Sequence, residues 1–284
     1  MITVRDFHRA WGPATPLRTL PMRVYIKDES SRFGLNAYKI LGASWALHNL
    51  NLAPSRVGGN AQIKRSAIVT ATSGNHGRAV AHAARKLGLI CHVYIPRGAN
   101  PVRVARIQSE GATLKFIDGD YDEAARCAER DANANGWQLV QDLVRPGYER
   151  IPGWVIDGYA TLFAECEEQT PEPPQTVVLH MGAGNFAEAG WRHYRGKARV
   201  IVARPARGNR TLDCLTVEDV STGLLEGVTE YVEIDDDDAT RAVAYLEAHG
   251  IFAAPSGAGG VAGMLKLGIP GPVLAVVTEG KLTA

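Results

Sequence analysis

The chain has 284 residues, of which 45% are hydrophobic, and its formal net charge is +1. This length can bury the core of one large domain or two small ones. The near-neutral charge argues against nucleic acid as the main partner. No apolar run reaches the ~20 residues that span a bilayer, and the charged N-terminus does not resemble a signal peptide. We therefore expect a cytoplasmic protein with no membrane partner.

The four cysteines are scattered along the chain, without CxxC or paired-histidine spacing. Such isolated cysteines predict reduced thiols in the cytoplasm rather than a disulfide framework or a zinc site, and we expect no metal. They are Cys91, Cys127, Cys166 and Cys214.

A regular alternation of strands and helices follows a proline-containing lead-in over residues 1–21. The patterns predict strands over 22–27, 67–71, 90–95, 113–117, 137–141, 176–180, 199–203, 229–234 and 273–278. They predict helices over 39–50, 75–87, 101–110, 154–169, 185–194, 239–249 and 258–267, and another after the cap Asp120. Residues 54–66 and 142–153 are expected to be loops.

Strands that alternate with helices indicate parallel βαβ units and an α/β fold. The spacing favours two sheets. One is expected from about residues 66–141, and the other from the C-terminal part, which the N-terminal segment could join.

Lys39 begins an apolar helical run, just after a turn containing Gly34 and Asn36. Burial among apolar side chains lowers the pKa of a lysine. A neutral amine is what a Schiff base with an aldehyde cofactor requires. The alternative is a surface lysine that opens a helix. The apolar neighbours are Phe33, Leu35, Tyr38, Ile40 and Leu41.

Two glycine motifs each join a predicted strand to a predicted helix. The first is TSGNHG at residues 72–77, and the second is GAGNF at residues 182–186. Free backbone N–H groups at such a junction can hold a carboxylate or a phosphate. The plainer interpretation of the first is a glycine-eased helix cap. The second also partly fits a dinucleotide fingerprint, with Arg204 available for a 2′-phosphate, so an NADP-binding reductase stays open.

A third glycine motif, SGAGG at residues 256–260, favours close helix packing over contact with a cofactor or substrate. The acidic run at residues 235–238 favours a helix cap that complements the dipole. A calcium site is the alternative, but the ligand spacing and the turn glycine are missing.

Several long, collinear motifs resemble diaminopropionate ammonia-lyase, a family of the fold type II pyridoxal phosphate enzymes that include serine/threonine dehydratases and cysteine synthases. The resemblance is dense over about residues 15–205 and looser in the C-terminal third. The motifs are KDESSRFGLNAYKILGASWA, ATSGNHGRAVAHAA, DGDYDEAARCAE, GWQLVQD, GYERIPGWVIDGYATL and GAGNFAEAG.

The resemblance implies a tryptophan synthase β-like fold with two open, twisted, mostly parallel sheets and flanking helices. It implies a larger cofactor-binding domain from residues 1–38 and 151–284, and a smaller, mobile, substrate-side domain from residues 39–150. It also implies a homodimer that acts on a small amino acid.

The resemblance also implies roles for individual residues around pyridoxal 5′-phosphate. Lys39 would form the Schiff base, and Thr278 would face the pyridine nitrogen with a neutral hydroxyl. Asn75 would bond the ring oxygen. Further residues would hold the cofactor phosphate, namely Gly182, Ala183, Gly184, Asn185 and Phe186. The substrate carboxylate would be held by Thr72, Ser73, Gly74, Asn75 and His76.

The implied reaction is α,β-elimination, in which the β-amino group of a substrate such as 2,3-diaminopropionate leaves as ammonia and pyruvate forms. Asp142 matches a family aspartate proposed as the base, with Lys39 as the rival base and a loop cap as the plainer interpretation. Ser73 stands where the family has aspartate and would relay a proton from the opposite face. Because dehydratases carry serine there, a serine/threonine dehydratase-like or β-replacement enzyme stays open, as does a binding protein without catalysis.

Overall fold

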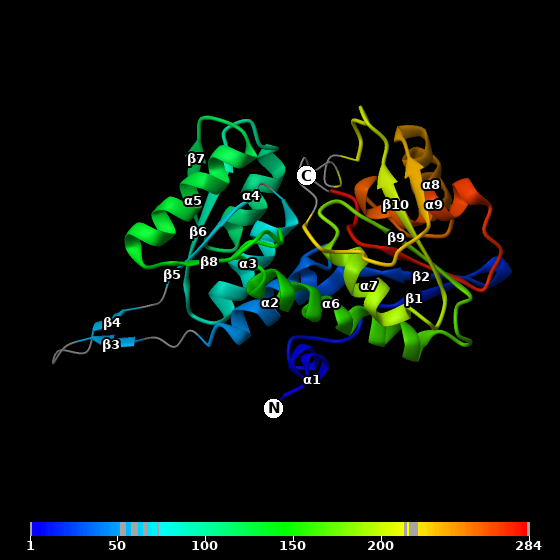
Figure 1. The fold of residues 1–284 in the computed structure, drawn as a ribbon, viewed down its shortest axis with the longest axis horizontal. Helices are drawn as coiled ribbons and strands as arrows, with labels where there is room; N and C mark the ends of the chain where they lie inside the picture. Colours follow the sequence, from blue (N-terminus) through cyan, green and yellow to red (C-terminus); the bar gives the residue numbers. More distant parts are fainter. Residues whose placement is uncertain are drawn as a thin grey trace. The chain divides into compact units, whose positions relative to one another are not determined.

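The computed structural model describes residues 2–51, 55–57, 62–64, 67–72, 74–212, 215 and 221–282. It divides into two compact units. Unit 1 comprises Met1–Tyr38, Leu143–Glu149 and Ile156–Thr283, and unit 2 comprises Lys39–Asp142, Arg150–Val155 and Ala284. Each unit contains its own sheet (Figure 1).

Unit 1 contains a six-stranded sheet in the order β1-β2-β12-β9-β10-β11. The β1 and β2 strands pair antiparallel, and the other neighbours pair parallel. The strands are β1 Leu17–Leu20, β2 Val24–Asp28, β9 Thr176–His180, β10 Arg199–Pro205, β11 Tyr231–Ile234 and β12 Val273–Val277. The α-helices are α1 Val4–Arg9, α7 Asn185–Tyr194, α8 Asp236–Ala248, α9 Gly259–Leu267 and α6 Arg150–Gln169, whose residues 150–155 belong to unit 2. Short 3-10 helices are η1 Pro21–Arg23, η2 Glu29–Gly34 and η3 Ser256–Ala258.

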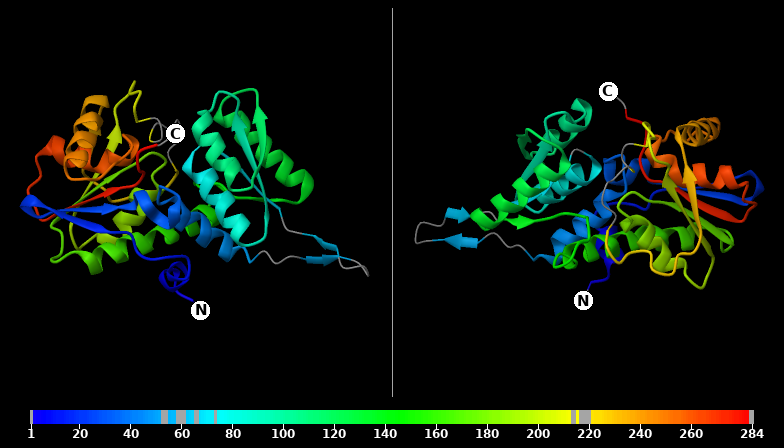
Figure 2. Two further views of the ribbon diagram at one scale, coloured as in Figure 1. Left: turned by 180° about the vertical axis from the view of Figure 1, so that it is seen from behind. Right: turned by 45° about the horizontal axis from the view of Figure 1, so that its top comes forward.

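Helices cover both faces of this sheet, with α8 and α9 on one face and α7 on the other (Figure 2). Every residue of β9 and β12 is buried, which is why both strands are almost continuous apolar runs.

The third glycine motif, at residues 256–260, packs closely within unit 1. A Cβ at Gly257 would lie 2.3 Å from the Glu279 carbonyl oxygen, and one at Gly260 would lie 2.8 Å from the Val178 carbonyl oxygen. Close packing, as favoured from the sequence, is therefore confirmed.

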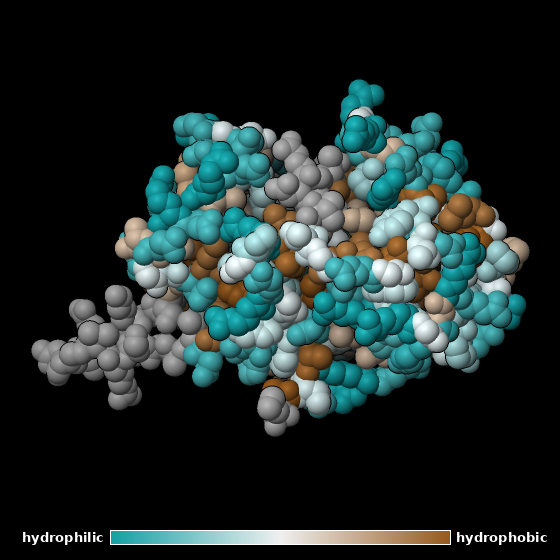
Figure 3. All heavy atoms as spheres, viewed as in Figure 1, coloured by the Kyte–Doolittle hydropathy of each residue, from teal (hydrophilic) through white to brown (hydrophobic). Residues whose placement is uncertain are grey.

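Unit 2 contains a four-stranded parallel sheet in the order β7-β6-β5-β8, with α5 on one face and α3 on the other. Hydrophilic side chains cover its outer helices on the face drawn in Figure 3, while their apolar sides face the sheet. The strands are β5 Ala67–Ala71, β6 Ile90–Pro96, β7 Thr113–Ile117 and β8 Gln138–Leu139, with a separate antiparallel pair of β3 Ser55–Val57 and β4 Gln62–Lys64. The helices are α2 Lys39–Asn49, α3 Asn75–Lys86, α4 Pro101–Ser109 and α5 Tyr121–Asn135.

Side-chain caps define several helix ends, including the one predicted at Asp120. The Asn100 side chain accepts from the Val102 N–H at the start of α4, and the Asp120 side chain accepts from the Glu123 N–H at the start of α5. Asp235 and Asp238 form a reciprocal capping box at α8, so the capping role of the acidic run is confirmed.

The two sheets and the alternation of elements are confirmed, but five local predictions were wrong. The lead-in contains a strand, β1, and the 54–66 loop contains β3 and β4. The strand expected over 137–141 shortens to β8, and the strand expected from residue 22 begins at Val24. Helix α6 begins at Arg150, inside the expected 142–153 loop, because proline is tolerated in a first helical turn. Within the described residues no helix has the length and apolar character to cross a membrane.

Candidate active site

Lys39 and Asp142, the two leading catalytic candidates, meet in unit 2. Lys39 is the first residue of α2, and Asp142 follows β8. Lys39 Nζ donates to Asp142 Oδ2 at 2.8 Å. The lysine side chain is 24% exposed and the aspartate side chain 16%. The amine therefore lies beside a carboxylate, a partner that its apolar neighbours in the sequence did not predict.

His76 completes this group from the first turn of α3. Its Nε2 lies 3.2 Å from the Val140 carbonyl oxygen, and its Nδ1 lies 3.6 Å from Asp142 Oδ2. Burial lowers the pKa of His76, which leaves the imidazole neutral at pH 7. Burial alone would raise the pKa of Asp142, but nearby positive charge, on His76 when that ring is protonated and on Lys39, outweighs it and the net pKa lies well below its ordinary value. Asp142 is therefore a carboxylate.

The first glycine motif lies beside this group, between β5 and α3. The Gly74 N–H donates to Thr72 Oγ1 at 3.1 Å, and the Thr72 N–H donates to the Tyr94 carbonyl oxygen at 3.0 Å. No side chain caps α3 at Gly74, so its first N–H groups can meet an anion. A Cβ at Gly77 would lie 2.5 Å from Thr72 Cγ2, which explains the second glycine of GNHG. Asn75 is the first residue of α3, whereas Ser73 lies outside the described residues.

The second glycine motif lies in unit 1, between β9 and α7. Gly184 has φ +101°, a conformation that side chains other than glycine rarely adopt, and no side chain caps α7. Ser221 fixes the loop, because its N–H donates to the Ala183 carbonyl oxygen at 3.0 Å and its Oγ donates to Asn185 Oδ1 at 2.9 Å. The Phe186 ring is buried against Tyr38. The Asn185 and Phe186 side chains are thus engaged within the protein, which leaves their backbone for an anion.

Thr278 follows β12 in unit 1, and its hydroxyl has a defined environment. The Gly260 N–H donates to His180 Nδ1 at 3.1 Å, so the other ring nitrogen of a neutral His180 carries the proton. His180 Nε2 then donates to Thr278 Oγ1 at 2.9 Å. The Thr278 hydroxyl therefore accepts from the histidine and keeps its own proton for another acceptor.

The sequence did not predict three of these contacts: His180 with Thr278, Ser221 with the second glycine motif, and the His76 side chain with Asp142. Each joins residues that are distant in the chain, so spacing gave no signal for the pairing. Arg204, by contrast, does not support a 2′-phosphate site. Its guanidinium donates to Glu233 at 3.0 Å and lies over the Tyr231 ring.

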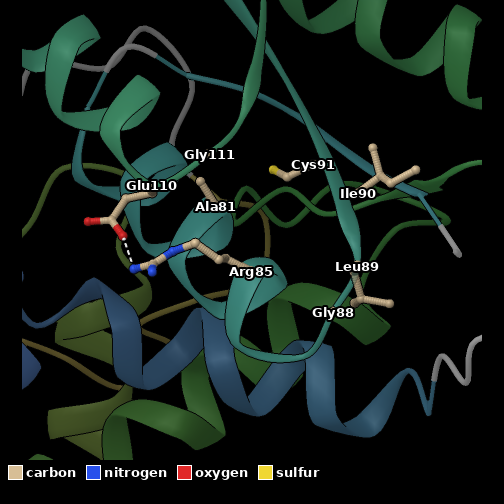
Figure 4. A pocket seen from close by; sticks show the side chains of 8 residues that line it. All are labelled: Ala81, Arg85, Gly88, Leu89, Ile90, Cys91, Glu110 and Gly111. Atoms are coloured by element: carbon tan, nitrogen blue, oxygen red, sulfur yellow. Dashed lines mark hydrogen bonds and ion pairs between the residues drawn. The ribbon is translucent and has the colours of Figure 1, made fainter.

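A separate pocket on unit 2 contains none of the predicted site residues (Figure 4). Its charged groups pair with one another. Glu110 accepts from Arg85 Nη2 at 2.8 Å and lies 2.9 Å from His82 Nδ1. The pocket is lined by Ala81, Arg85, Gly88, Leu89, Ile90, Cys91, Glu110 and Gly111. In the described part of the chain, no group of three or more His, Cys, Asp or Glu side chains could hold a metal ion.

Residues 11–279 match the family described as "Pyridoxal-phosphate dependent enzyme", and the chain belongs to that family. The donors described above fit its cofactor: a half-buried amine at Lys39, an uncapped glycine turn with Gly184 at positive φ, and a neutral hydroxyl at Thr278. The cofactor is therefore pyridoxal 5′-phosphate.

Within this family the chain is similar to diaminopropionate ammonia-lyase. It is 38% identical to the enzyme of Salmonella typhimurium over 218 residues, which cover 69% of this chain and 54% of that enzyme. The match thus spans about half of that enzyme's length. The structure of holo diaminopropionate ammonia lyase from Escherichia coli superimposes with a TM-score of 0.85 and 29% identity, covering 98% of this chain and 87% of that one. The same Escherichia coli enzyme in complex with an aminoacrylate-PLP azomethine reaction intermediate gives a TM-score of 0.81 and 28% identity, covering 98% and 88%. The predicted fold type II class is confirmed.

Proposed function

We propose that the protein is a carbon-nitrogen lyase that performs α,β-elimination on a small amino acid, with 2,3-diaminopropionate as the first candidate and pyruvate and ammonia as products. The observation that carries this proposal is the Lys39–Asp142 hydrogen bond, which places an amine and a carboxylate base together after β8. The similarity to diaminopropionate ammonia-lyase supports the choice of substrate.

In this proposal the cofactor is held in two ways. Lys39 would bond the aldehyde carbon, and the backbone of Gly182, Ala183 and Gly184 would bind the phosphate at the start of α7. Thr278 offers its hydroxyl proton to the pyridine nitrogen, which stays unprotonated. When bound, pyridoxal phosphate withdraws electrons from the substrate Cα and so makes its proton more acidic.

Asp142 is the proposed base for that proton. Beside the Lys39 ammonium it is a weak base, because the ion pair favours its charged form. The substrate amine would displace Lys39 from the aldehyde, and the released lysine would be a neutral amine. Asp142 would then lose its charged partner, and its pKa would rise toward the working pH, where a general base is most effective. The substrate carboxylate binds at the start of α3, to the backbone around Thr72, Gly74 and Asn75, and Asn75 also bonds the ring oxygen.

Ser73 favours a second candidate of the same chemistry, a serine/threonine dehydratase-like or β-replacement enzyme, because the residue is serine rather than aspartate. In both cases unit 1 would carry the cofactor and unit 2 would be the mobile, substrate-side part. We also propose a homodimer in the cytoplasm, which light scattering after size-exclusion chromatography and fractionation of cells would test.

A substrate panel tests the proposal. Purified holoenzyme is assayed for pyruvate or another oxo acid with both enantiomers of 2,3-diaminopropionate, serine and threonine. We expect the highest kcat/KM with one diaminopropionate enantiomer. Faster turnover of serine or threonine would favour the dehydratase. Visible cofactor absorbance without turnover of any substrate would indicate a binding protein, and a nicotinamide-dependent absorbance change would favour the reductase.

A further inference from the structure

His76 has one ring nitrogen that no described group satisfies. A carbonyl oxygen can only accept, so the nitrogen facing Val140, Nε2, carries the proton of the neutral ring. Nδ1 is then an unprotonated acceptor, and it is buried without a hydrogen-bond partner among the described residues. Buried polar atoms are rarely left unsatisfied, and an exception calls for an explanation.

The polar atom that this nitrogen faces is Asp142 Oδ2, at 3.6 Å. Two acceptors cannot bond each other, so the pair has no hydrogen bond while Asp142 is charged. A hydrogen bond between the two side chains becomes possible when Asp142 takes up a proton. The carboxyl group then becomes a donor, and His76 Nδ1 is the acceptor in front of it.

We propose that His76 is the second carrier of the substrate α-proton, receiving it from Asp142 and returning it for departure of the leaving group. This inference rests on the proposed function. The Cα–H bond breaks, its electron pair stays with the substrate, and the proton goes to Asp142. The proton then moves to His76 Nδ1, which gives an imidazolium that still donates from Nε2 to Val140 and restores the Asp142 carboxylate. By the reverse path it reaches the β-amino group. The electron pair left on the substrate then forms the Cα=Cβ bond as the Cβ–N bond breaks, and the nitrogen leaves with that bond's electron pair and the proton as ammonia.

The charges around His76 tie this transfer to the state of Lys39. Burial lowers the pKa of His76, the Asp142 carboxylate raises it, and the Lys39 ammonium lowers it. On its own helix, Arg78 and His82 face Glu110 instead. While Lys39 is charged, His76 stays neutral. When Lys39 is an uncharged amine, one influence that opposes protonation of His76 is removed.

The first test needs no turnover. Ring nitrogen shifts of His76 in the ¹⁵N-labelled full-length apoprotein are followed against pH, with His76→Gln used to assign the signal. We expect the Nε2-protonated tautomer in the wild type. Lys39→Gln should raise the pKa of His76, and Asp142→Asn should lower it, because these variants remove charges of opposite sign. His82→Gln, on the same helix, is the matched control and should leave both tautomer and pKa unchanged.

A proton on Nδ1 of the resting protein, or a His76 pKa that ignores both Lys39→Gln and Asp142→Asn, would overturn the proposal. In the holoenzyme, glutamine at position 76 can still bond Val140 and Asp142 but cannot carry the proton. His76→Gln should therefore lower kcat by about 10²-fold, with KM and the visible cofactor absorbance unchanged. An unchanged kcat would also overturn it.

If the wild type turns over none of the amino acids, the proposed function fails. The titration then still decides the coupling between His76 and Asp142.

Discussion

Two groups of buried charges, one in each unit, differ in how completely they are satisfied. In unit 1, Lys27 Nζ donates to the Thr15 carbonyl oxygen at 2.7 Å, to Glu165 at 2.7 Å and to Gln169 at 2.8 Å, so all three protons are used. Arg32 bonds Glu165 and, through two nitrogens, Glu29. In unit 2, Lys39 bonds Asp142, and beside them His76 Nδ1 has no hydrogen-bond partner among the residues that the structure describes.

The difference fits a structural ionic network in unit 1 and the proton transfer proposed above in unit 2. Lys27, Arg32, Glu29 and Glu165 balance two positive with two negative charges, and each side chain is less than 9% exposed. Such a network holds one arrangement, because removing any partner leaves a buried charge uncompensated. In unit 2, the Lys39 and Asp142 side chains are more exposed, at 24% and 16%. His76 Nδ1 is an acceptor without a partner among the described residues, so it could receive a proton.

The largest effect should come from Lys39→Ala. This variant removes the amine that bonds the cofactor, so we expect kcat to fall on the order of 10⁴-fold or more and the visible cofactor absorbance to disappear. Steady-state kinetics and absorbance spectra measure both. If the absorbance survived in Lys39→Ala, the cofactor would have to be held by another amine.

Asp142→Asn should have the next largest effect. The amide keeps the size of the side chain but cannot take up a proton, so kcat should fall by about 10²- to 10⁴-fold. Cofactor absorbance should remain, because Lys39 is intact. Normal turnover by Asp142→Asn would instead assign the base to Lys39.

Lys27→Met, unlike the two preceding variants, should lower stability, and it should leave cofactor binding intact. It removes a buried charge from the unit 1 network and leaves Glu165 and Gln169 short of a donor. We expect the free energy of unfolding to fall by about 3–5 kcal/mol, while cofactor absorbance persists below the unfolding temperature. Urea denaturation measures the loss. A change within 0.5 kcal/mol, roughly the scatter for surface substitutions, would mean that the network is not structural.

The smallest expected effect is a gradual loss of folding stability at acidic pH, caused by Glu165. Burial alone would raise the pKa of Glu165, but Arg32 and Lys27 outweigh it and the net pKa is lowered from its ordinary value of 4.5. The stabilisation is therefore complete above the unfolded-state pKa and is lost as pH falls through the lower folded-state pKa. Urea midpoints should decline below about pH 4.5. Glu165→Gln should flatten that decline, although it is less stable at pH 7, and an equally steep decline would exclude Glu165 as its source.

The sequence predicted most of the architecture because alternating strand and helix patterns are local. The failures have physical causes. The prolines at 13, 16 and 21 made the lead-in resemble a linker, although β1 fits between the last two. The loop expected over residues 142–153 ends earlier, because Pro152 fits in the first turn of α6. Helix caps at Asn100, Asp120 and Asp235 were predictable because each bond spans two or three residues.

The site was predictable only as far as motifs extend. Lys39 and Asp142 could be singled out one by one, but their hydrogen bond joins residues 103 positions apart. The bond from His180 to Thr278 spans 98 positions, and the one from Lys27 to Glu165 spans 138. No pattern within a single strand or helix encodes such distant pairs. The unsatisfied Nδ1 of His76 is still harder to predict from the sequence, because it is recognised only by the lack of a hydrogen-bond partner among the described residues.

Lys39 and Asp142 are also the first and last residues of the continuous segment of unit 2. Because their side chains meet at 2.8 Å, this segment leaves and rejoins the rest of the chain at neighbouring points. A segment with adjacent ends can be inserted into a host sequence as a cassette without stretching either one. Lys39 and Asp142, the two residues proposed to act on the substrate, are thus also the boundaries of a segment that could be transferred to another protein by domain insertion.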